Sequence, residues 1–501
     1  MESAPPHIRA FFDSQSYPHP ADNIEMIQTH ISWVFLAGDY AYKFKKPVNF
    51  GFLDFTTPEK RKLFCQRELA LNRIFFPELY LGMHSICRNG DSYTLDGDGD
   101  SEILDYCLKM KRFLQNDLLD RKLQAGTFNP SWMDALAIET AEFHRQSDSN
   151  SDIDVIGLLQ AHIETNLEVA SRHLDDGLNA ETISQLSSHY EQVLPDLIPL
   201  LQRRQQAGFI RHCHGDLHLK NIALVEDRPR LFDCIEFNDD FSTIDTMNDV
   251  AFLIMDCDAR KRPDLGLRFL SRYLDHSGDY AGLMLLPLYL FYRATVRGKV
   301  ACLMADELTG EARAAQFLEA SIYFELALSY WQRRPASLFA IGGLSGSGKS
   351  HLALLGCGAE RAIIIRSDAT RKRIAPLHPQ LALYSKQMHI ITYAAMFDAA
   401  RSTLDAGFSV ILDATFIHPD SRKQLKAVAD KMRIPLHLFW LDIDESLLRE
   451  RVNARQLTAT DISDADTHVL NLQLEEYERP SEAWLIFLNS SNSWPSGTGC
   501  N

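Results

Sequence analysis

The nine residues "GGLSGSGKS" at 342–350 constrain the fold of this chain more than any other feature. They match the pattern G-x₄-G-K-[ST], follow the apolar run "SLFAI" and precede a helical pattern. Glycines let backbone N–H groups point at phosphate oxygens, and the start of a helix adds its positive end. We therefore predict a phosphate-binding loop. In it the Lys349 side chain reaches the outer phosphates, and the Ser350 hydroxyl can bind Mg²⁺. The other residues predicted to bind the nucleotide are Gly343, Ser345, Gly346, Ser347 and Gly348.

The segment after this loop alternates apolar strands with helical patterns. The strands are "AIIIR", "SVILD" and "LHLFWLD", each short and bounded by polar residues. Such alternation predicts a parallel sheet covered by helices, so we expect an α/β domain over 337–501. Ligands of open α/β sheets bind at the carboxyl ends of the strands.

Charged residues lie at or just beyond those strand ends. Asp368 follows one strand with Arg371 three residues later, and Asp413 ends the next strand. Arg451 and Arg455 are four residues apart, on one face of a predicted helix. A small-molecule kinase needs a carboxylate at the acceptor hydroxyl and arginines at the transferring phosphoryl group. Two simpler interpretations stay open: Asp368 could cap the following helix, and the arginines could be surface charges.

Residues 337 to about 488 resemble the P-loop kinase group of polynucleotide 5′-hydroxyl kinases, gluconate kinases and zeta-toxin-like kinases. The resemblance implies that Asp368 is the base or the carboxylate that orients the substrate, and that Arg371 contacts substrate or phosphate. It makes Arg451 and Arg455 catalytic lid residues that act with Lys349. Asp413 resembles a Walker B carboxylate that holds Mg²⁺, although it could face substrate instead.

A second set of residues, far from the phosphate loop, has the order of a kinase-like cleft. In "HGDLHLKNI", Asp216 and Asn221 have the spacing Asp-x₄-Asn, and Asp233 follows the strand "RLFD". Lys43 lies on the strand "AYKF", and Glu68 lies on a helix predicted between two hairpins. Phosphoryl transfer needs a positioned hydroxyl and neutralised phosphate charge, which such residues supply.

Several assignments in this set have alternatives. Lys45 and Lys46 compete with Lys43 for the phosphate-binding role, and Glu68 could belong to a solvated face of "EKRKLFCQRE". We expect His214 to pack the loop rather than to react, and His218 to be a loop side chain.

"HGDLHLKNI" followed by "LFDCIEF" resembles the aminoglycoside phosphotransferase-like family, which includes choline and homoserine kinases. The resemblance covers roughly residues 30–330 and implies an α+β protein-kinase-like fold. It makes Asp216 the catalytic base, Asn221 and Asp233 the Mg²⁺ ligands, and Lys43, paired with Glu68, the residue that binds the phosphates of ATP.

The whole chain resembles two-domain bacterial proteins in which this kinase-like domain precedes an ATP-binding domain. We predict a kinase-like domain over 1–331, with a β-rich lobe at about 22–110 and a helical lobe at about 111–331. A linker at 332–336 then leads to the P-loop domain at 337–501. We further expect a hairpin around 96–100 and a frayed tail in "NSSNSWPSGTGCN".

Composition narrows the environment and the partners. No apolar run reaches the ~18 residues that a membrane span requires, and the first residues have no pattern of a secretory signal. Nine scattered cysteines without CxxC pairs indicate a reduced cytoplasm. The first 335 residues hold 34 Lys and Arg against 49 Asp and Glu, which argues against a nucleic-acid partner.

These observations predict a bifunctional, ATP- and Mg²⁺-dependent phosphotransferase that acts on small-molecule hydroxyl groups. Two alternatives come from other classes of protein. One is a regulatory protein in which one nucleotide site serves as a switch. The other is a nucleic-acid 5′-hydroxyl kinase built on the C-terminal domain.

Overall fold

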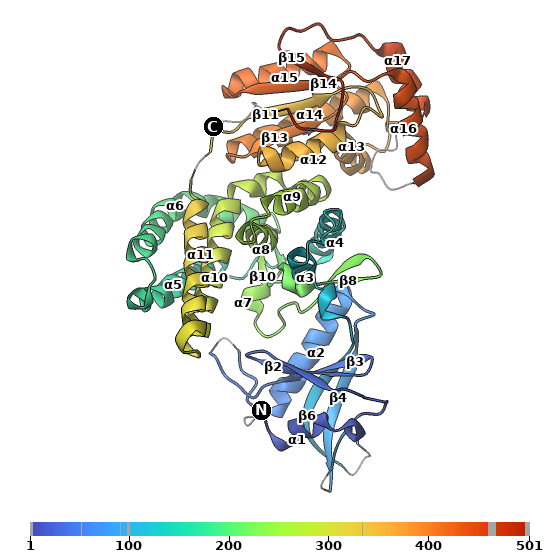
Figure 1. The fold of residues 1–501 in the computed structure, drawn as a ribbon. Helices are drawn as coiled ribbons and strands as arrows, with labels where there is room; N and C mark the ends of the chain where they lie inside the picture. The colour runs from blue at the N-terminus through green and yellow to red at the C-terminus, as the bar shows by residue number, and fades with distance from the viewer. Residues whose placement is uncertain are drawn as a thin grey trace. The chain divides into compact units, whose positions relative to one another are not determined.

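The fold is described from a computed structural model (Figure 1). It describes residues 4–51, 53–90, 92–97, 101–332, 334–458 and 467–495. By contacts between residues the chain forms two compact units, and each is treated by itself below. The first comprises Met1–Asn129, Ser147–Val155 and Gly208–Asp249, and the second Pro130–Gln146, Ile156–Ala207 and Val250–Asn501. The domain boundaries at 331/332 and 336/337 stay a prediction.

A six-stranded antiparallel sheet forms the β-rich part of the first unit, in the order β1-β2-β3-β6-β4-β5. The predicted strand, turn and strand beginning near residue 31 are confirmed, because β2 and β3 pair across Gly38. The strands are β1 (Glu25–Gln28), β2 (Ser32–Ala37), β3 (Tyr40–Lys45), β4 (Tyr80–Asn89), β5 (Ser92–Leu95) and β6 (Glu102–Lys111).

The hairpin predicted around residues 96–100 is wrong. Strand β5 pairs with β4, and β6 also pairs with β4, so β4 lies between the two strands that the sequence seemed to join. The hairpin turn is at Gly90, which has a positive φ, and it connects β4 to β5. Residues 98–100 lie outside the described residues, and alternation alone did not predict which strands pair.

Helix α2 (Pro58–Phe75) carries Glu68 into the interior. The Thr57 side chain accepts a hydrogen bond from the Lys60 N–H, and Pro58 occupies the first position, as expected at a helix start. The buried residues recur every three or four positions, which places them on one face: Arg61, Cys65, Glu68, Asn72 and Phe75. The solvated-face interpretation of Glu68 is therefore wrong, since that side chain is fully buried.

Short strands frame the loop that contains Asp216. Strand β7 pairs antiparallel with β10, and β8 pairs antiparallel with β9. The bounds are β7 (Ile210–His212), β8 (Ile222–Val225), β9 (Arg228–Leu231) and β10 (Thr243–Asp245). The remaining helices of this unit are α1 (Pro6–Arg9), η1 (Ala10–Phe12), η2 (Ser14–Ser16), η3 (Gln115–Asp117), α3 (Leu119–Gln124), η5 (Leu219–Asn221) and α7 (Asp239–Ser242).

The second unit begins with helices, as the sequence predicts for this region. These are α4 (Trp132–Gln146), α5 (Val155–Ser171), η4 (Leu174–Asp176), α6 (Ala180–Gln206), α8 (Thr246–Ala259), α9 (Pro263–Ser277), η6 (Tyr280–Met284), α10 (Leu286–Asp306) and α11 (Gly310–Ser329). Two of them, α5 and α8, begin in segments assigned to the first unit. None of the helices within the described residues is long and apolar enough to cross a membrane.

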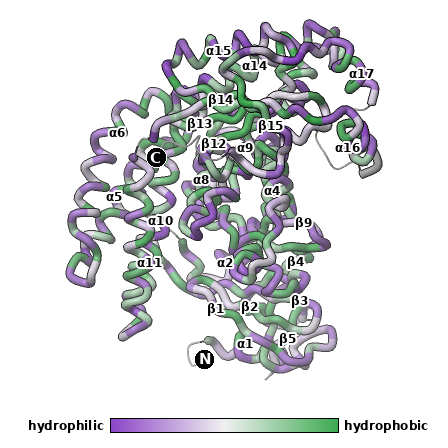
Figure 2. The backbone as a smooth tube through the Cα atoms, turned by 45° about the horizontal axis from the view of Figure 1, so that its top comes forward, coloured by the Kyte–Doolittle hydropathy of each residue, from purple (hydrophilic) through white to green (hydrophobic). Residues whose placement is uncertain are grey.

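A five-stranded parallel sheet completes the second unit, in the order β12-β13-β11-β14-β15. Its inner strands are almost entirely buried, and Figure 2 shows them in the hydrophobic colour. The strands are β11 (Leu338–Gly342), β12 (Ala362–Arg366), β13 (Ser409–Asp413), β14 (Leu436–Leu441) and β15 (Leu485–Leu488). The helices are α12 (Lys349–Ala359), α13 (Ser367–Ile374), η7 (Ala375–Leu377), α14 (Lys386–Asp405), α15 (Pro419–Met432), α16 (Glu445–Thr458) and α17 (Thr467–Glu476).

Helix α9 covers the edge of this sheet at β12. The Ile364 N–H donates to the Ser271 hydroxyl at 3.0 Å, and the Arg366 N–H donates to the Asp275 carboxylate. Ser271 and Asp275 are four apart on α9, while Ile364 and Arg366 are two apart on β12, so both pairs lie on facing surfaces. An edge strand leaves unpaired N–H groups, and α9 satisfies two of them.

The frayed tail predicted at 489–501 is wrong for residues 489–495, and residues 496–501 lie outside the described part. The Trp494 ring packs against Phe339 and Phe439, with ring centroids 5.5 and 5.0 Å apart. Its Nε1 donates to the Glu360 carboxylate at 2.8 Å. Trp494 thus packs this polar segment against the sheet. The polar composition of the segment did not predict that contact.

Candidate active sites

Lys43 joins two carboxylates in the first unit. Its Nζ lies 2.7 Å from Glu68 Oε1 and 2.5 Å from Asp233 Oδ1. Strand β3, helix α2 and the segment after β9 thus bring three distant residues together, in the arrangement that the sequence predicts. Burial lowers the pKa of Lys43, but Asp233 and Glu68 outweigh it and hold that pKa well above its usual range.

Lys45 extends the same cluster inward. Its Nζ lies 2.7 Å from Glu68 Oε2 and also pairs with Glu236. Glu68 therefore bridges two lysines; burial alone would raise its pKa, yet Lys43 and Lys45 lower it to about 2. Lys46 is elsewhere and donates to the Thr29 carbonyl. Because Lys45 is almost fully buried, Lys43 is the lysine that can face a phosphate.

Asp216 and Asn221 are held together by the short helix η5. The Asn221 amide donates to Asp216 Oδ2 at 2.8 Å and to the Asp216 carbonyl at 3.0 Å. His218 Nε2 lies 3.4 Å from the same Asp216 oxygen. The Asp216 side chain is about one-third exposed, so it can meet an acceptor. His218 is a loop side chain, as expected, and it also contacts the predicted base.

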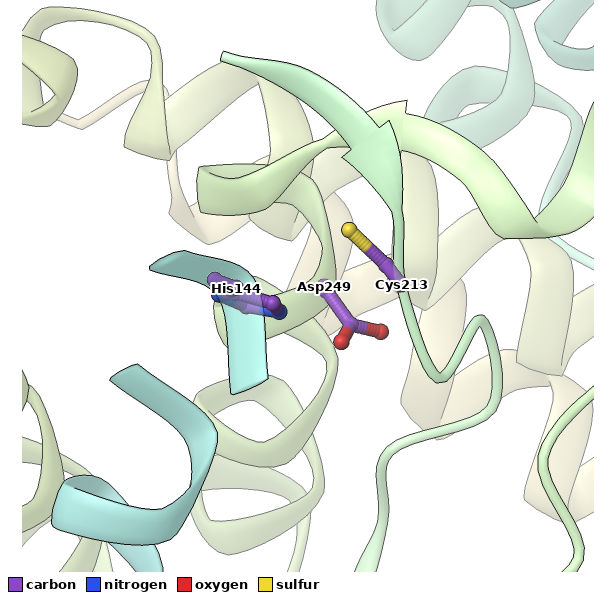
Figure 3. A group of neighbouring side chains, drawn as sticks. All are labelled: His144, Cys213 and Asp249. Carbon is purple, nitrogen blue, oxygen red and sulfur yellow. The ribbon is translucent and has the colours of Figure 1, made fainter. Parts of the chain in front are cut away.

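The loop before Asp216 is fixed from below by Asp249, which the sequence reasoning missed. Its carboxylate accepts hydrogen bonds from the N–H groups of His214 at 3.1 Å and Gly215 at 2.9 Å. Figure 3 shows this carboxylate near Cys213, the residue that follows β7. His214 Nε2 meets the Phe232 carbonyl at 3.0 Å, which fits its predicted packing role. Burial lowers the pKa of His214, so the ring is neutral at pH 7.

The β8–β9 hairpin places Asp233 next to Asn221. Ile222 pairs with Leu231, and the Phe232 N–H donates to the Asn221 carbonyl at 3.1 Å. Asp233 follows directly with a φ of +62°, and its N–H donates to the Tyr80 hydroxyl at 3.2 Å. Such a φ is strained for a residue other than glycine and is typical of functional positions. An amide oxygen and a carboxylate are ligands that suit Mg²⁺.

The phosphate loop has the predicted strand–loop–helix form between β11 and α12. Gly346 and Gly348 have φ of +85° and +94°, where any other residue is strained. A Cβ on Gly346 would also lie 2.8 Å from the Leu448 carbonyl of α16. Lys349 Nζ donates to the Leu344 carbonyl at 2.9 Å, across the loop. The lysine is therefore folded over the place where phosphate oxygens would sit.

Ser350 and Asp413 meet at the carboxyl ends of the central strands. The Ser350 hydroxyl donates to Asp413 Oδ2 at 2.7 Å. This contact agrees with the Walker B interpretation of Asp413 rather than the substrate-facing one, because both residues then present oxygen ligands to one Mg²⁺. Arg366, which the sequence reasoning did not single out, lies against the same two residues.

Asp368 and Arg371 form a pair at the start of α13. Asp368 Oδ1 accepts from Arg371 Nη1 at 2.7 Å. Asp368 lies in the first turn of α13, whose N-cap residue Arg366 makes no capping hydrogen bond with its side chain, so the helix-cap interpretation of Asp368 stays open. The Arg371 guanidinium lies 5.1 Å from the centre of the Tyr384 ring.

Aromatic side chains of α14, His389 and Tyr393, lie near this pair. The His389 ring is tilted against the Tyr393 ring, with centroids 4.3 Å apart, and meets the His418 ring edge to face, with centroids 5.2 Å apart. Burial, His418 and Arg371 lower the pKa of His389 to about 4, so the ring is neutral at pH 7. The sequence contains no motif that marks these residues; only folding brings them together.

Arg451 reaches the phosphate loop from α16. Its Nη1 lies 3.4 Å from the Gly346 carbonyl and 3.5 Å from the Ser347 carbonyl. The surface-charge interpretation is therefore wrong for Arg451. Arg455 lies in α16, but its side chain is outside the described part of the chain. A residue that the sequence reasoning missed, Gln473 of α17, accepts the Ser345 N–H at 2.9 Å and so contacts the loop as well.

Comparisons with known proteins find relatives for the whole chain and for its C-terminal part. The AAA domain family matches residues 338–480. The uncharacterized protein Rv2004c of Mycobacterium tuberculosis is 31% identical over 451 residues, 87% of this chain and 88% of its own length. The chain belongs to the Rv2004c family. The uncharacterized protein Mb2027c of Mycobacterium bovis, a further member, has the same identity and coverage.

Solved structures resemble each half of this Rv2004c family member. Choline kinase from Cryptosporidium parvum covers 64% of this chain and 94% of its own, at 12% identity and a TM-score of 0.42. A gluconokinase from Sinorhizobium meliloti covers 31% of this chain and 83% of its own, at 22% identity and a TM-score of 0.24. The N-terminal part is α+β, and the C-terminal part, which the AAA domain family matches, holds the phosphate loop and a parallel sheet.

Proposed function

We propose that this chain is a phosphotransferase with two sites, each transferring the γ-phosphoryl group of ATP to a hydroxyl group of a small molecule. The observation that supports the proposal is that the residues proposed for each site include one carboxylate suited to an acceptor hydroxyl and further oxygen groups suited to Mg²⁺. These are Asp216 with Asn221 and Asp233, and Asp368 with Ser350 and Asp413. A nucleotide switch needs only the second kind of group.

In the first site the residues divide the work of transfer. Lys43 is held by Glu68 and faces the phosphates of ATP. Asp216 Oδ2 is oriented by the Asn221 amide, so it can accept the proton of an acceptor hydroxyl as that oxygen attacks. Mg²⁺, when bound by Asn221 and Asp233, would neutralise charge on the phosphates.

In the second site the backbone replaces most of these side chains. The N–H groups of the phosphate loop and the start of α12 bind phosphate oxygens. Asp368, fixed by Arg371, orients the acceptor hydroxyl and accepts its proton. Lys349 and Arg451 stabilise charge that develops during transfer. Mg²⁺ at Ser350 and Asp413 would hold the outer phosphates.

The acceptor of the second site faces the rings of Tyr384, His389 and Tyr393 beside Arg371. Such rings stack against a planar or sugar-like molecule. The near balance of charge after residue 335, 17 Lys and Arg against 18 Asp and Glu, does not favour a polynucleotide. A small metabolite is therefore the proposed acceptor class.

The test is a screen of metabolites, nucleosides and oligonucleotide 5′-ends for ATP-dependent phosphorylation by the full chain. Each acceptor found is then assigned to a site with Asp216→Asn and Asp368→Asn. The matched control is Asp398→Asn, an exposed residue of α14 that pairs with Arg401. A small acceptor whose labelling disappears in one of the two variants supports the proposal. Phosphorylation of oligonucleotide ends alone would support the nucleic-acid kinase, and tight ATP binding with no acceptor would support the switch.

A further inference from the structure

Arg366 contacts the two residues that we propose as Mg²⁺ ligands in the second site. Its Nη2 donates to the Ser350 hydroxyl at 3.2 Å, and its Nε lies 3.4 Å from Asp413 Oδ2. These are the two side chains that the proposed function gives to Mg²⁺. One guanidinium therefore contacts both of the oxygen ligands that the sequence assigns to the metal.

The charge of Asp413 explains why a cation is needed there. Its side chain is only 5% exposed, and an isolated carboxylate at such depth is costly. The Ser350 hydroxyl and the Arg366 guanidinium supply a hydrogen bond and a positive charge to it. When Mg²⁺ arrives with a nucleotide, it brings two positive charges to the same oxygens.

The backbone of Arg366 is fixed from the other side of β12. Its N–H donates to the Asp275 carboxylate on α9, and the neighbouring Ile364 N–H donates to Ser271. The guanidinium therefore extends from an anchored residue at the end of an edge strand rather than from a loop. Its side chain is 17% exposed, so few alternative positions are open to it.

We propose that Arg366 is a positioning residue that competes with Mg²⁺ for the Ser350 hydroxyl and the Asp413 carboxylate of the second site. It holds the Ser350 hydroxyl and the Asp413 carboxylate in their metal-binding arrangement and competes with free divalent ions for them. The negative charge of the ATP phosphates would draw the guanidinium away from Asp413, so that Ser350 and Asp413 would hold Mg²⁺ when the nucleotide is bound. This inference rests on the proposed function in one respect, the role of Ser350 and Asp413 as ligands.

The test measures Mn²⁺ binding to the full chain without nucleotide. The electron paramagnetic resonance signal of the free ion reports how much Mn²⁺ stays unbound. Arg366→Gln should create or tighten one Mn²⁺ site by about tenfold or more, because a competing positive charge is removed. Arg366→Lys keeps the charge but reaches Ser350 and Asp413 less well, so its Mn²⁺ affinity should lie between those of the wild type and Arg366→Gln. A second measurement adds ADP, which should reduce the difference between wild type and Arg366→Gln.

Two controls make the result specific. Arg361→Gln removes the same charge five residues earlier, from a side chain that pairs with Asp258, and should bind Mn²⁺ as the wild type does. Arg366→Gln combined with Asp413→Asn should lose the gained site. Equal Mn²⁺ affinity in wild type and folded Arg366→Gln overturns the inference. If Asp413→Asn leaves Mn²⁺ binding unchanged even with ADP present, the metal role in the proposed function fails instead.

Should Arg366→Gln fail to fold, as judged by its melting curve, Arg366→Lys alone still decides the matter. A shorter ammonium cannot reach both Ser350 and Asp413 in the way that the planar guanidinium does. Lys should therefore bind Mn²⁺ more tightly than the wild type by a factor smaller than Gln would give. An affinity equal to or weaker than that of the wild type contradicts competition.

Discussion

The two candidate sites are built on opposite principles. The first is an assembly of charged side chains from β3, α2, the Asp216 loop and the segment after β9. The second is mostly one continuous loop whose backbone is shaped by glycines, with Asp413 and Arg451 added from elsewhere. An ATP phosphate can thus be held by buried ion pairs or by peptide N–H groups.

This difference decides where each site is vulnerable. In the first site a substitution at Glu68 leaves the buried charge of Lys45 without one of its partners, so structure and chemistry fail together at that cluster. In the second site the loop keeps its shape when a side chain is changed, so chemistry can fail alone. The predictions below separate these two kinds of loss.

The largest effect is expected for Asp216→Asn. It removes the proposed base but keeps a side chain of the same shape, so transfer at the first site should fall by about 10²–10⁴-fold. ATP affinity should stay near that of the wild type. The measurement is single-turnover transfer and ATP binding with an acceptor from the screen. Asp239→Asn, on an exposed side chain that pairs with Arg67, is the control; an equal loss in both variants would argue against a base.

A smaller effect, on stability, is expected for Glu68→Gln. Glu68 bridges Lys43 and Lys45, and removing one partner from a buried ion pair costs about 3–5 kcal/mol. Urea unfolding monitored in the full chain should show an early transition for the first unit. Glu59→Gln, an exposed residue of the same helix, is the control. If both variants unfold like the wild type, the cluster is not a structural core of the site.

These two predictions show what the sequence could and could not provide. The contiguous loop at 342–350 and the spacing of Asp216, Asn221 and Asp233 were readable because each motif is local. Glu236, Asp249 and Gln473 were not recognised as site residues, because each acts through a contact that only the fold creates. The hairpin near 96–100 failed for a related reason, since strand order is a long-range property.

Burial also separated alternatives that periodicity left open. The pattern of α2 allowed Glu68 to be solvated or internal, and the structure places it inside. Likewise, the spacing of Arg451 and Arg455 predicts a shared helical face but not what that face contacts. Arg451 turned out to lie on the phosphate loop. Sequence patterns thus predicted two candidate sites, while packing added the residues that contact their members.

The smallest effect is a pH dependence of the free energy of unfolding. It arises from Asp275, whose carboxylate accepts the Arg366 N–H. Burial raises the pKa of Asp275 to about 7, although Arg366, Arg272 and Arg373 oppose the shift. The folded protein therefore binds this proton more tightly than the unfolded chain does. The stabilisation is complete below about pH 4, the unfolded pKa of an aspartate, and is lost as the pH rises through about 7.

Asp275→Asn removes this proton linkage. Between pH 5 and 7 the wild-type free energy of unfolding should decline by about 1 kcal/mol per pH unit relative to the variant. Chemical unfolding at a series of pH values measures the difference. Asp264→Asn, a partly exposed residue at the start of the same helix that pairs with Arg262, is the control and should follow the wild type. Parallel pH profiles for wild type and Asp275→Asn would contradict the raised pKa.

The central claim is that one chain holds two nucleotide sites of unrelated construction. Equilibrium binding of a non-hydrolysable ATP analogue with Mg²⁺ to the full chain tests it without any acceptor. We predict two analogue molecules per wild-type chain, one in Lys349→Ala and one in Asp233→Ala, with the remaining affinity differing between the two variants. A single bound analogue in the wild type, or the loss of all binding in Lys349→Ala alone, would contradict the claim.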